Sequence, residues 1–456
     1  MGKKTVVSFL TAAALITGVS GYLVADTYDL VPGYLTFKEP EFGNALPERE
    51  KVQLDTILPA QMRTDLPPLK NSDLLPVWKE LESSTGGKWN AGAYVIDGTT
   101  GNVVFAANEK TPVVPASTTK LYTAYITLES LDPQARLATR LYQNGDTLHL
   151  VGEGDLLLSP EAGDTQQIIG HAGLEDLVAQ AANKLKTAEV KPTKLVLHTQ
   201  LHQGPALDPA IKEDYRVWIS PQTAFAFNAG STPGGYDQDP TAAVGDKLAK
   251  LFAKHDLQLE VQYTDQALDP QQQNALAEVK SATIAQITRI MLERSDNTLA
   301  EHLCRLSAHA KTGSSTPEAS FNYLTQQVQK LPIPHAGFVI KSCSGLTEDN
   351  RIAPQTTAEF LYHLWTSGNP AAKQLFRMNP VSGYSGTLFY RLNTPVTAGR
   401  VQAKTGLMDS AAALSGVAIT NTGRPLIFHV QTASVPEAAY LTRVDLDAFL
   451  EALVNR

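Results

Sequence analysis

Strand-like segments in two widely separated parts of the chain most constrain its fold. Residues 91–97 (AGAYVID) and 102–109 (NVVFAANE) are joined by Gly-Thr-Thr-Gly, which predicts a β-hairpin. Three further strand-like runs lie near the C-terminus, at 399–406, 411–420 and 425–434, and VDLDAFLEALVN closes the chain as a helical segment. With helical patterns between these groups, the order predicts an α+β fold: a five-stranded antiparallel sheet covered by helices, with the final helix packed on one face.

The N-terminal segment predicts export from the cytoplasm. Two lysines precede TVVSFLTAAALITGVSGYLVA (5–25), an apolar run that carries no charge. The run is long for a signal-peptide core and just long enough to cross a bilayer, so residues 1–25 are either a cleaved signal peptide or a retained membrane anchor. Residues 26–72, rich in proline and polar side chains, then form a linker, and the remainder lies outside the cytoplasm.

Charge and cysteine content narrow the possible partners. Lys and Arg number 38 against 46 Asp and Glu, which gives a net charge of −8. The chain has no long run of Lys and Arg that could follow a phosphate backbone, so nucleic acid is excluded as a partner. The two cysteines, Cys304 and Cys343, either pair in an oxidising compartment or remain separate buried thiols, and spacing alone does not decide between these alternatives.

A change of pattern divides the globular part into three segments. Residues 73–134 hold a short helix, the hairpin and a further helix. Residues 135–278 mix strands with short helices and with loops rich in Gly, Pro and Gln, whereas helices return in 279–456. The motifs with reactive side chains, described below, lie before residue 135 and after residue 278. The middle segment is therefore predicted to be an inserted mixed α/β domain.

Ser117 and Lys120 open a predicted helix over 117–131, stopped by Asp132-Pro133. Residues i and i+3 share a helix face, so the lysine amine lies within reach of the serine oxygen. A buried neutral lysine could act as a base for a serine nucleophile. The alternative is a helix-capping serine beside an unrelated lysine, because serine often caps helices.

Two downstream motifs favour the catalytic interpretation. Ser295-Asp296-Asn297 lies between two predicted helices within 282–313, where short polar side chains can project into a cleft. Lys404-Thr405-Gly406 lies in a strand pattern, where Gly406 lets a ligand approach the backbone closely. With Ser117 and Lys120, these motifs supply a nucleophile, two amines and a second hydroxyl.

Other stretches contain similar tripeptides or a pair of histidines that could bind a metal. Lys311-Thr312-Gly313 ends a predicted helix with glycine at its C-cap, and Ser367-Gly368-Asn369 precedes proline as a turn. His198 and His202 follow a strand pattern, with neither the helix nor the glutamate of a zinc-protease motif. The sequence therefore predicts no metal site and no cofactor.

Ser-x-x-Lys, Ser-Asp-Asn and Lys-Thr-Gly, in this order, are the motifs of penicillin-binding proteins and serine β-lactamases. The chain resembles more particularly the D-alanyl-D-alanine carboxypeptidases typified by penicillin-binding protein 4, the S13 peptidases. The resemblance covers about 90–435 and includes these stretches: PASTTKLYTAYITLESL (115–131), LVGEGDLLL (150–158), MLERSDNTLAEHL (291–303), CSGLTEDNRIAP (343–354), NPVSGYSGTLFYRL (379–392) and AGRVQAKTG (398–406). It implies a β-lactamase/transpeptidase-like fold.

The resemblance also implies a serine D-Ala-D-Ala carboxypeptidase that acts on bacterial peptidoglycan stem peptides and is acylated by β-lactams. Ser117 would attack the penultimate D-alanine while Lys120 accepts its proton. Ser295, helped by Lys404, would relay a proton to the leaving amine, and the charge of Lys404 would hold down the pKa of Lys120. Cleavage of D,D cross-links as an endopeptidase would follow the same route.

Substrate binding is implied in the same way. Asn297 would bind a backbone amide of the peptide. Thr405 with Lys404 would hold the terminal carboxylate, beside Gly406, and the backbone N–H groups of Ser117 and Leu407 would form the oxyanion hole.

Two residues depart from the family pattern. Leu407 stands where the family usually has a second hydroxyl residue, and Cys343 stands where glycine is usual, which favours a bond to Cys304. The alternatives to a carboxypeptidase are a β-lactamase and a non-catalytic sensor of β-lactams or peptidoglycan. If the N-terminal segment is held in the bacterial cytoplasmic membrane, the protein lies in the cell envelope under each of these three alternatives.

Overall fold

The computed structural model describes residues 66, 69, 74–84, 90–268, 274–433 and 439–456. The predicted signal peptide or anchor, 1–25, lies outside the described residues, as does nearly all of the linker 26–72. Within the described part, no helix combines the length and the apolar character that crossing a membrane requires.

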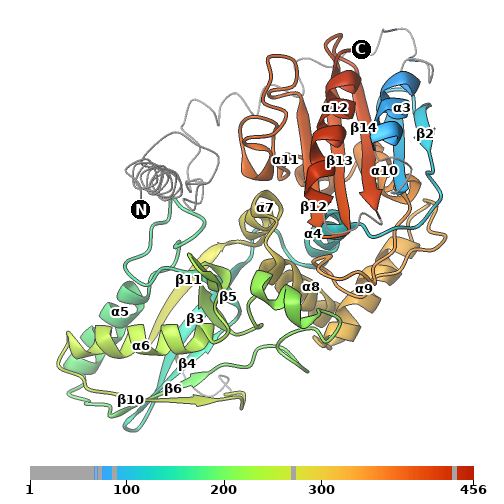
Figure 1. Cartoon of the computed structure of the whole chain (residues 1–456). Coiled ribbons are helices and arrows are strands. Elements are labelled where there is room, and N and C mark those ends of the chain that lie inside the picture. Colours follow the sequence, from blue (N-terminus) through green and yellow to red (C-terminus); the bar gives the residue numbers. More distant parts are fainter. Residues whose placement is uncertain (1–65, 67–68, 70–73, 85–89, 269–273, 434–438) are drawn as a thin grey trace, which may run out of the picture. The chain divides into compact units, whose positions relative to one another are not determined.

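A five-stranded antiparallel sheet forms the centre of one part of the structure (Figure 1). Its strand order is β12-β13-β14-β1-β2, so the N-terminal hairpin pairs with the last strand of the C-terminal group. The strands are β1 Asn90–Asp97, β2 Val103–Ala107, β12 Val401–Met408, β13 Ala411–Ile419 and β14 Pro425–Ala433. All residues of β13 and β14 are buried, because helices cover both faces, and this explains their nearly continuous apolar runs. The predicted sheet is confirmed.

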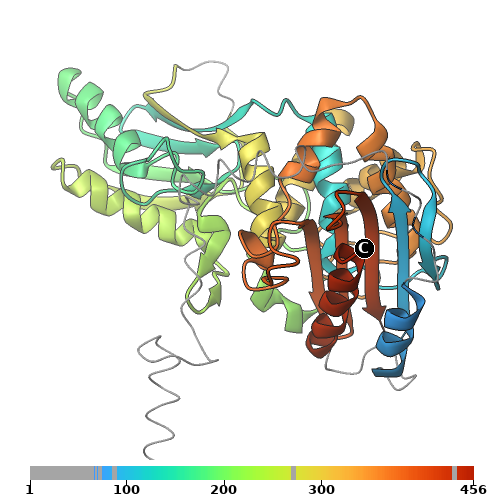
Figure 2. The same ribbon diagram turned by 90° about the horizontal axis from the view of Figure 1, so that it is seen from above.

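Two helices cover one face of this sheet, and a larger group covers the other (Figure 2). On the first face, Trp78, Phe105 and Phe449 pack together, with ring centroids 5.4 to 5.8 Å apart. The final helix therefore packs on the sheet as predicted. The first face carries α3 Leu75–Ser84 and α12 Arg443–Val454. On the second face α10 Pro354–Thr366 packs on β1, β13 and β14, and it shares one apolar core with α4 Lys120–Ser130, α7 Ile284–Arg294, α8 Asn297–Thr312, α9 Pro317–Gln329 and α11 Pro370–Arg377.

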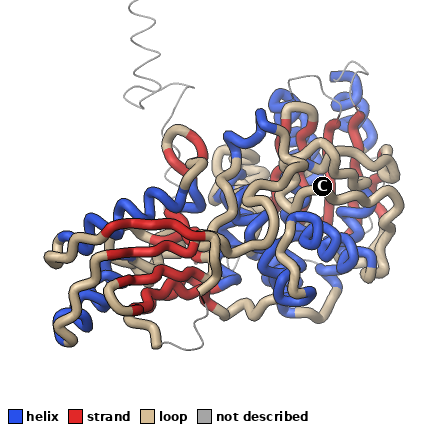
Figure 3. The backbone as a smooth tube through the Cα atoms, turned by 90° about the horizontal axis from the view of Figure 1, so that it is seen from below, coloured by secondary structure: helices blue, strands red, loops and turns tan. Residues whose placement is uncertain are grey.

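A second five-stranded sheet, β10-β6-β4-β3-β11, comes from the chain between α4 and α7 (Figure 3). It is mixed, because β4 pairs in parallel with β6 and β6 with β10, while its other pairs are antiparallel. Helices α5 Leu174–Thr187 and α6 Pro240–Ala253 pack against it around a core of its own. The strands are β3 Arg136–Asn144, β4 Thr147–Gly152, β6 Lys194–His198, β10 Glu260–Thr264 and β11 Ala277–Thr283; short pairs are β5 Asp155–Leu158 with β7 Phe225–Phe227, and β8 Ser231–Thr232 with β9 Gly235–Tyr236.

This second sheet occupies the segment predicted to be an inserted domain, and the division into domains stays a prediction. The predicted boundary after residue 278 falls inside β11, which continues to Thr283. Thr283 then caps α7 by accepting a hydrogen bond from the Gln286 backbone N–H, so strand and helix follow each other without a linker.

Candidate active site

Ser117 lies in a tight turn and not in the first turn of the α-helix. The predicted helix over 117–131 begins only at Lys120, and a 3₁₀ turn, Ala116–Thr119, precedes it. Ala116 has a left-handed backbone (φ 48°), which an α-helix cannot include. No side chain caps either helical segment, so the interpretation of Ser117 as a helix cap is wrong. The turn instead presents the half-buried serine hydroxyl at the start of α4.

Two glycines allow neighbouring backbone to approach this turn. Gly345 has φ +80°, and a Cβ there would lie 2.0 Å from the Ala116 carbonyl oxygen. A Cβ at Gly406 of β12 would lie 2.9 Å from the Pro115 carbonyl oxygen. Side chains at these positions would displace the turn, so both glycines contribute to the placement of Ser117.

Lys120 is fully buried, and its amine contacts three oxygens. Nζ lies 2.8 Å from Ser117 Oγ, 2.7 Å from Asn297 Oδ1 and 2.7 Å from the Ser344 carbonyl oxygen. The amide and carbonyl oxygens can only accept hydrogen bonds, whereas the serine hydroxyl can also donate one. A neutral amine would therefore use its two N–H groups on Asn297 and Ser344 and direct its lone pair at the Ser117 hydroxyl.

Burial lowers the pKa of Lys120 to about 7, although the nearby carboxylates of Asp296 and Glu301 act in the opposite direction. Burial is the largest cause of this shift, and a contribution from the charge of Lys404 stays a prediction. Burial also lowers the pKa of Lys404 well below its ordinary value, and repulsion from Lys120 adds to that effect.

The Ser-Asp-Asn motif lies at the junction of α7 and α8, as predicted. Ser295 ends α7 in the left-handed conformation (φ 57°), which is uncommon for a residue with a side chain and often marks functional sites. Asp296 caps α8 by accepting a hydrogen bond from the Leu299 N–H. Asn297 bonds Lys120 through Oδ1 and donates from Nδ2 to the Trp218 carbonyl, which leaves one N–H of Nδ2 for a ligand.

Lys404 of β12 contacts Ser295, the second serine of the site. Its buried Nζ lies 2.8 Å from Ser295 Oγ and 2.7 Å from the Thr405 carbonyl oxygen. Because the carbonyl can only accept, Nζ keeps one N–H on Thr405 and can exchange a proton with the Ser295 hydroxyl. Residues from α4, from the α7–α8 junction and from β12 thus form two Ser–Lys pairs.

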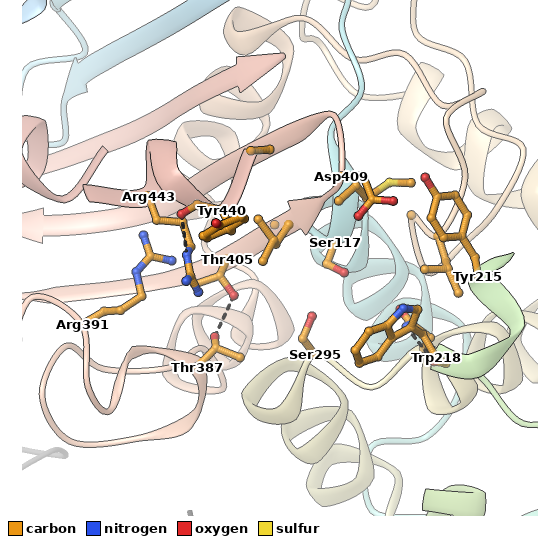
Figure 4. A pocket seen from close by; sticks show the side chains of 17 residues that line it. Ser117, Tyr215, Trp218, Ser295, Thr387, Arg391, Thr405, Asp409, Tyr440 and Arg443 are labelled. Carbon is orange, nitrogen blue, oxygen red and sulfur yellow. Dashed lines mark hydrogen bonds between the residues drawn. The ribbon is translucent and has the colours of Figure 1, made fainter. Parts of the chain in front are cut away.

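The two pairs open onto a cavity of about 350 Å³ (Figure 4). Ser117 and Ser295 lie in its middle, between groups of side chains that differ in character. The lining residues are Ser117, Tyr215, Trp218, Ser295, Asn297, Gly345, Leu346, Thr387, Arg391, Thr405, Gly406, Leu407, Met408, Asp409, Ala439, Tyr440 and Arg443. The predicted substrate-binding residues Asn297, Thr405, Gly406 and Leu407 border this cavity, and Leu407 is 43% exposed. Lys404, predicted to help Thr405 hold the carboxylate, is fully buried and does not line it.

Several lining residues were not predicted to bind substrate. Thr387 and Arg391 belong to NPVSGYSGTLFYRL, a stretch noted only for its resemblance, and Arg443 begins α12. Tyr215 and Trp218 belong to a short 3₁₀ segment of the predicted insertion, Glu213–Trp218. Only the family resemblance of residues 379–392 could have pointed to any of them.

The repeated motifs elsewhere have structural roles. Lys311 lies in the last turn of α8, and Gly313 ends that helix with φ 75°, as the sequence predicts. Ser367 follows the last residue of α10, also as predicted. Neither Lys311 nor Ser367 borders the cavity.

The cysteines and histidines lie in the surrounding structure. Cys304 and Cys343 form a disulfide, with 6.3 Å between their Cα atoms, which answers a question that the sequence left open. His198 contacts His149 (3.1 Å), whereas His202 contacts His302 (3.0 Å). His198 and His202 therefore belong to two different histidine pairs. Within the described residues, no three His, Cys, Asp or Glu side chains are grouped as metal ligands.

Known proteins share this sequence pattern and fold. The family model of the D-Ala-D-Ala carboxypeptidase 3 (S13) family matches residues 82–238 and 236–452. Carboxypeptidase Rv3627c of Mycobacterium tuberculosis is 31% identical over 353 residues, which cover 73% of this chain and 74% of that protein.

Solved structures show a similar fold at lower sequence identity. Penicillin-binding protein 4 (dacB) from Haemophilus influenzae superimposes with a TM-score of 0.69 at 20% identity, covering 83% of this chain and 98% of that one. Bd3459, a predatory peptidoglycan endopeptidase from Bdellovibrio bacteriovorus, gives 0.53 at 16% identity, with 81% and 93% covered. The match of the family model over most of the chain establishes that this protein belongs to the D-Ala-D-Ala carboxypeptidase 3 (S13) family.

Proposed function

We propose that the chain is a serine-type D-Ala-D-Ala carboxypeptidase that acts on peptidoglycan stem peptides and is acylated by β-lactams. Membership of the family supports the reaction class. The observation that carries the serine mechanism is the environment of Lys120, whose buried amine has two pure acceptors and the Ser117 hydroxyl as its contacts.

Acylation would begin at Ser117. The neutral Lys120 accepts the hydroxyl proton while Oγ attacks the carbonyl carbon of the penultimate D-alanine. The negative charge that develops on the carbonyl oxygen would be stabilised by two backbone N–H groups. These belong to Ser117, in the 3₁₀ turn Ala116–Thr119, and to Leu407, in β12. Asn297 would hold the substrate amide with its remaining N–H.

The leaving D-alanine needs a proton on its amine. Ser295 would donate this proton and recover one from the ammonium form of Lys404, whose Nζ lies 2.8 Å from its oxygen, so that acylation leaves Lys120 with one proton more and Lys404 with one proton fewer. The terminal carboxylate of the leaving residue would bind at Thr405. Proton exchange with solvent would first return Lys120 to its neutral form and Lys404 to its protonated form. Lys120 would then accept a proton from the water that attacks the ester and return it to Ser117 Oγ as the ester bond breaks.

We infer that the enzyme works outside the cytoplasm, in the cell envelope. The substrate of the proposed reaction is located there, and the Cys304–Cys343 disulfide fits an oxidising compartment. Retention of residues 1–25 as an anchor in the cytoplasmic membrane belongs to the same proposal, and signal cleavage remains its alternative.

A two-substrate assay tests the function. A soluble fragment starting near residue 27 is treated with fluorescent penicillin and, separately, with an acyl peptide ending in D-Ala-D-Ala, and D-alanine release is followed. We expect stable labelling together with D-alanine release. Rapid hydrolysis of penicillin without peptide cleavage would establish a β-lactamase instead, and stable labelling without cleavage a sensor. A D,D-cross-linked peptide dimer, assayed in parallel, measures the predicted endopeptidase activity.

The pH dependence of acylation tests the role of Lys120. The base must be neutral, and its pKa is about 7, so kcat/KM is expected to fall as pH decreases through about 7, tenfold per pH unit. Above that pH the lysine is already neutral, and this limb of the profile should level off. Rates are measured between about pH 5 and 9, with unfolding followed at each pH. A lysine with an ordinary pKa of about 10.4 would instead let the rate rise throughout this range, and that outcome would contradict the assignment.

A further inference from the structure

The cavity has two ends of opposite character (Figure 4). On one side of Ser117 and Ser295 lie Tyr215, Trp218 and Asp409. On the other side lie two threonines and two arginines: Thr387, Thr405, Arg391 and Arg443. An anionic group of a ligand is therefore favoured at the second end and disfavoured beside the Asp409 carboxylate.

Two hydroxyls meet at the second end. Thr387 Oγ1 and Thr405 Oγ1 lie 2.7 Å apart, although they come from a 3₁₀ turn, Gly386–Leu388, and from β12. One of the two hydroxyls donates to the other in this structure, which leaves one O–H for a ligand; a bound carboxylate that took the place of this mutual bond could accept from both. Leu407 cannot donate such a bond, because it stands two residues beyond Thr405 with an apolar side chain.

The arginines give this end a net positive charge. Arg391 forms a forked ion pair with Asp447, at 2.7 and 3.1 Å. Among the described residues, Arg443 forms no ion pair, and its one hydrogen bond runs from Nε to the Tyr440 carbonyl, 3.0 Å away. Burial, and then repulsion from Arg391, lower the pKa of Arg443. Two cations thus face one carboxylate, and an anion in the cavity would balance the second cation.

We propose that Thr387 and Arg443 complete, together with Thr405, the binding site for the carboxylate of the leaving residue. Thr387 supplies the second hydroxyl that position 407 lacks, and Arg443 supplies the charge. This inference rests on the proposed function. It makes both residues determinants of the preference for a peptide with a free C-terminal carboxylate.

A pair of substrates isolates this interaction. The acyl peptide ending in D-Ala-D-Ala and the same peptide with a C-terminal amide share every group except the charged oxygen. The wild-type enzyme is expected to prefer the carboxylate in kcat/KM. In Thr387→Val and in Arg443→Gln this preference should fall by roughly 10- to 100-fold, because charge-assisted hydrogen bonds are lost, so that kcat/KM falls much more for the carboxylate than for the amide.

Two further variants separate a binding role from a structural one. Thr387→Ser keeps the hydroxyl and should restore the preference that Thr387→Val loses. Arg377→Gln removes an exposed arginine from the last turn of α11, away from the cavity, and should leave the preference unchanged. Should Arg443→Gln fail to fold, judged by thermal unfolding, the serine and valine variants of Thr387 still decide the question.

The outcomes for the site and for the proposed function are distinguishable. If the wild type cleaves the peptide but Thr387→Val and Arg443→Gln keep its full preference for the carboxylate, the inference is wrong and the carboxypeptidase assignment stands. If the wild type cleaves neither peptide and binds no penicillin, the proposed function itself fails.

Discussion

Replacement of Ser117 by alanine is expected to lower D-alanine release by a factor on the order of 10⁴ to 10⁶, because the atom that forms the acyl-enzyme is lost. The side chain is half-buried in a tight turn and has no capping role, so the variant should fold as the wild type does. D-alanine release is measured under saturating substrate, and thermal unfolding is compared for the two proteins.

Thr118→Ser is a suitable control for this substitution. Thr118 lies in the same turn, and its hydroxyl donates to the Pro115 carbonyl, a bond that serine can keep. The control should retain activity within about threefold, as expected for a conservative change that loses one methyl group. A Ser117→Ala enzyme that still releases D-alanine at a tenth of the wild-type rate would show that another residue is the nucleophile.

Replacement of Lys404 by alanine should lower both penicillin acylation and D-alanine release by roughly 10²- to 10⁴-fold, the range typical of general acid–base groups. Lys404 is fully buried, and its amine contacts Ser295, so its removal should interrupt the proposed delivery of a proton to the leaving group. Second-order acylation rates and D-alanine release are the two measurements.

The chain supplies a matched control for this variant in its second Lys-Thr-Gly. Lys311 is exposed in the last turn of α8, and Lys311→Ala should leave both rates within about twofold of the wild type. The reverse pattern, with loss of activity only in Lys311→Ala, would mean that the wrong triplet has been assigned. A Lys404→Ala protein with an unchanged thermal unfolding midpoint removes misfolding as an explanation.

Local patterns in the sequence were sufficient to predict the first sheet. Each of its strands is an apolar run bounded by turn residues, and the Gly-Thr-Thr-Gly turn pairs two of them directly. The second sheet was less accessible, because β4, β6 and β10 pair in parallel across long connections that no local turn specifies. The predicted boundary after residue 278 falls within strand β11, because this strand passes into α7 without a loop that would mark a boundary.

The candidate site was predictable where its chemistry lies in short motifs. Ser117, Ser295 and Lys404 each belong to a motif whose order along the chain is distinctive, and the fold brings them together. Thr387 was missed because it lies in an irregular segment, and its contact with Thr405 depends on how that segment folds beside β12. The size of the Lys120 pKa shift could not be predicted, because burial depends on the whole fold and cannot be read from a tetrapeptide.

Identification of the residue acylated by a β-lactam tests the central claim most directly. The protein is treated with penicillin and digested with a protease, and the modified peptide is sequenced by mass spectrometry. The proposed mechanism predicts one equivalent of penicilloyl adduct, attached to Ser117, and no adduct in Ser117→Ala. An adduct on any other residue, or one that persists in Ser117→Ala, would contradict the proposal that the Ser117–Lys120 pair is the nucleophile and base of this enzyme.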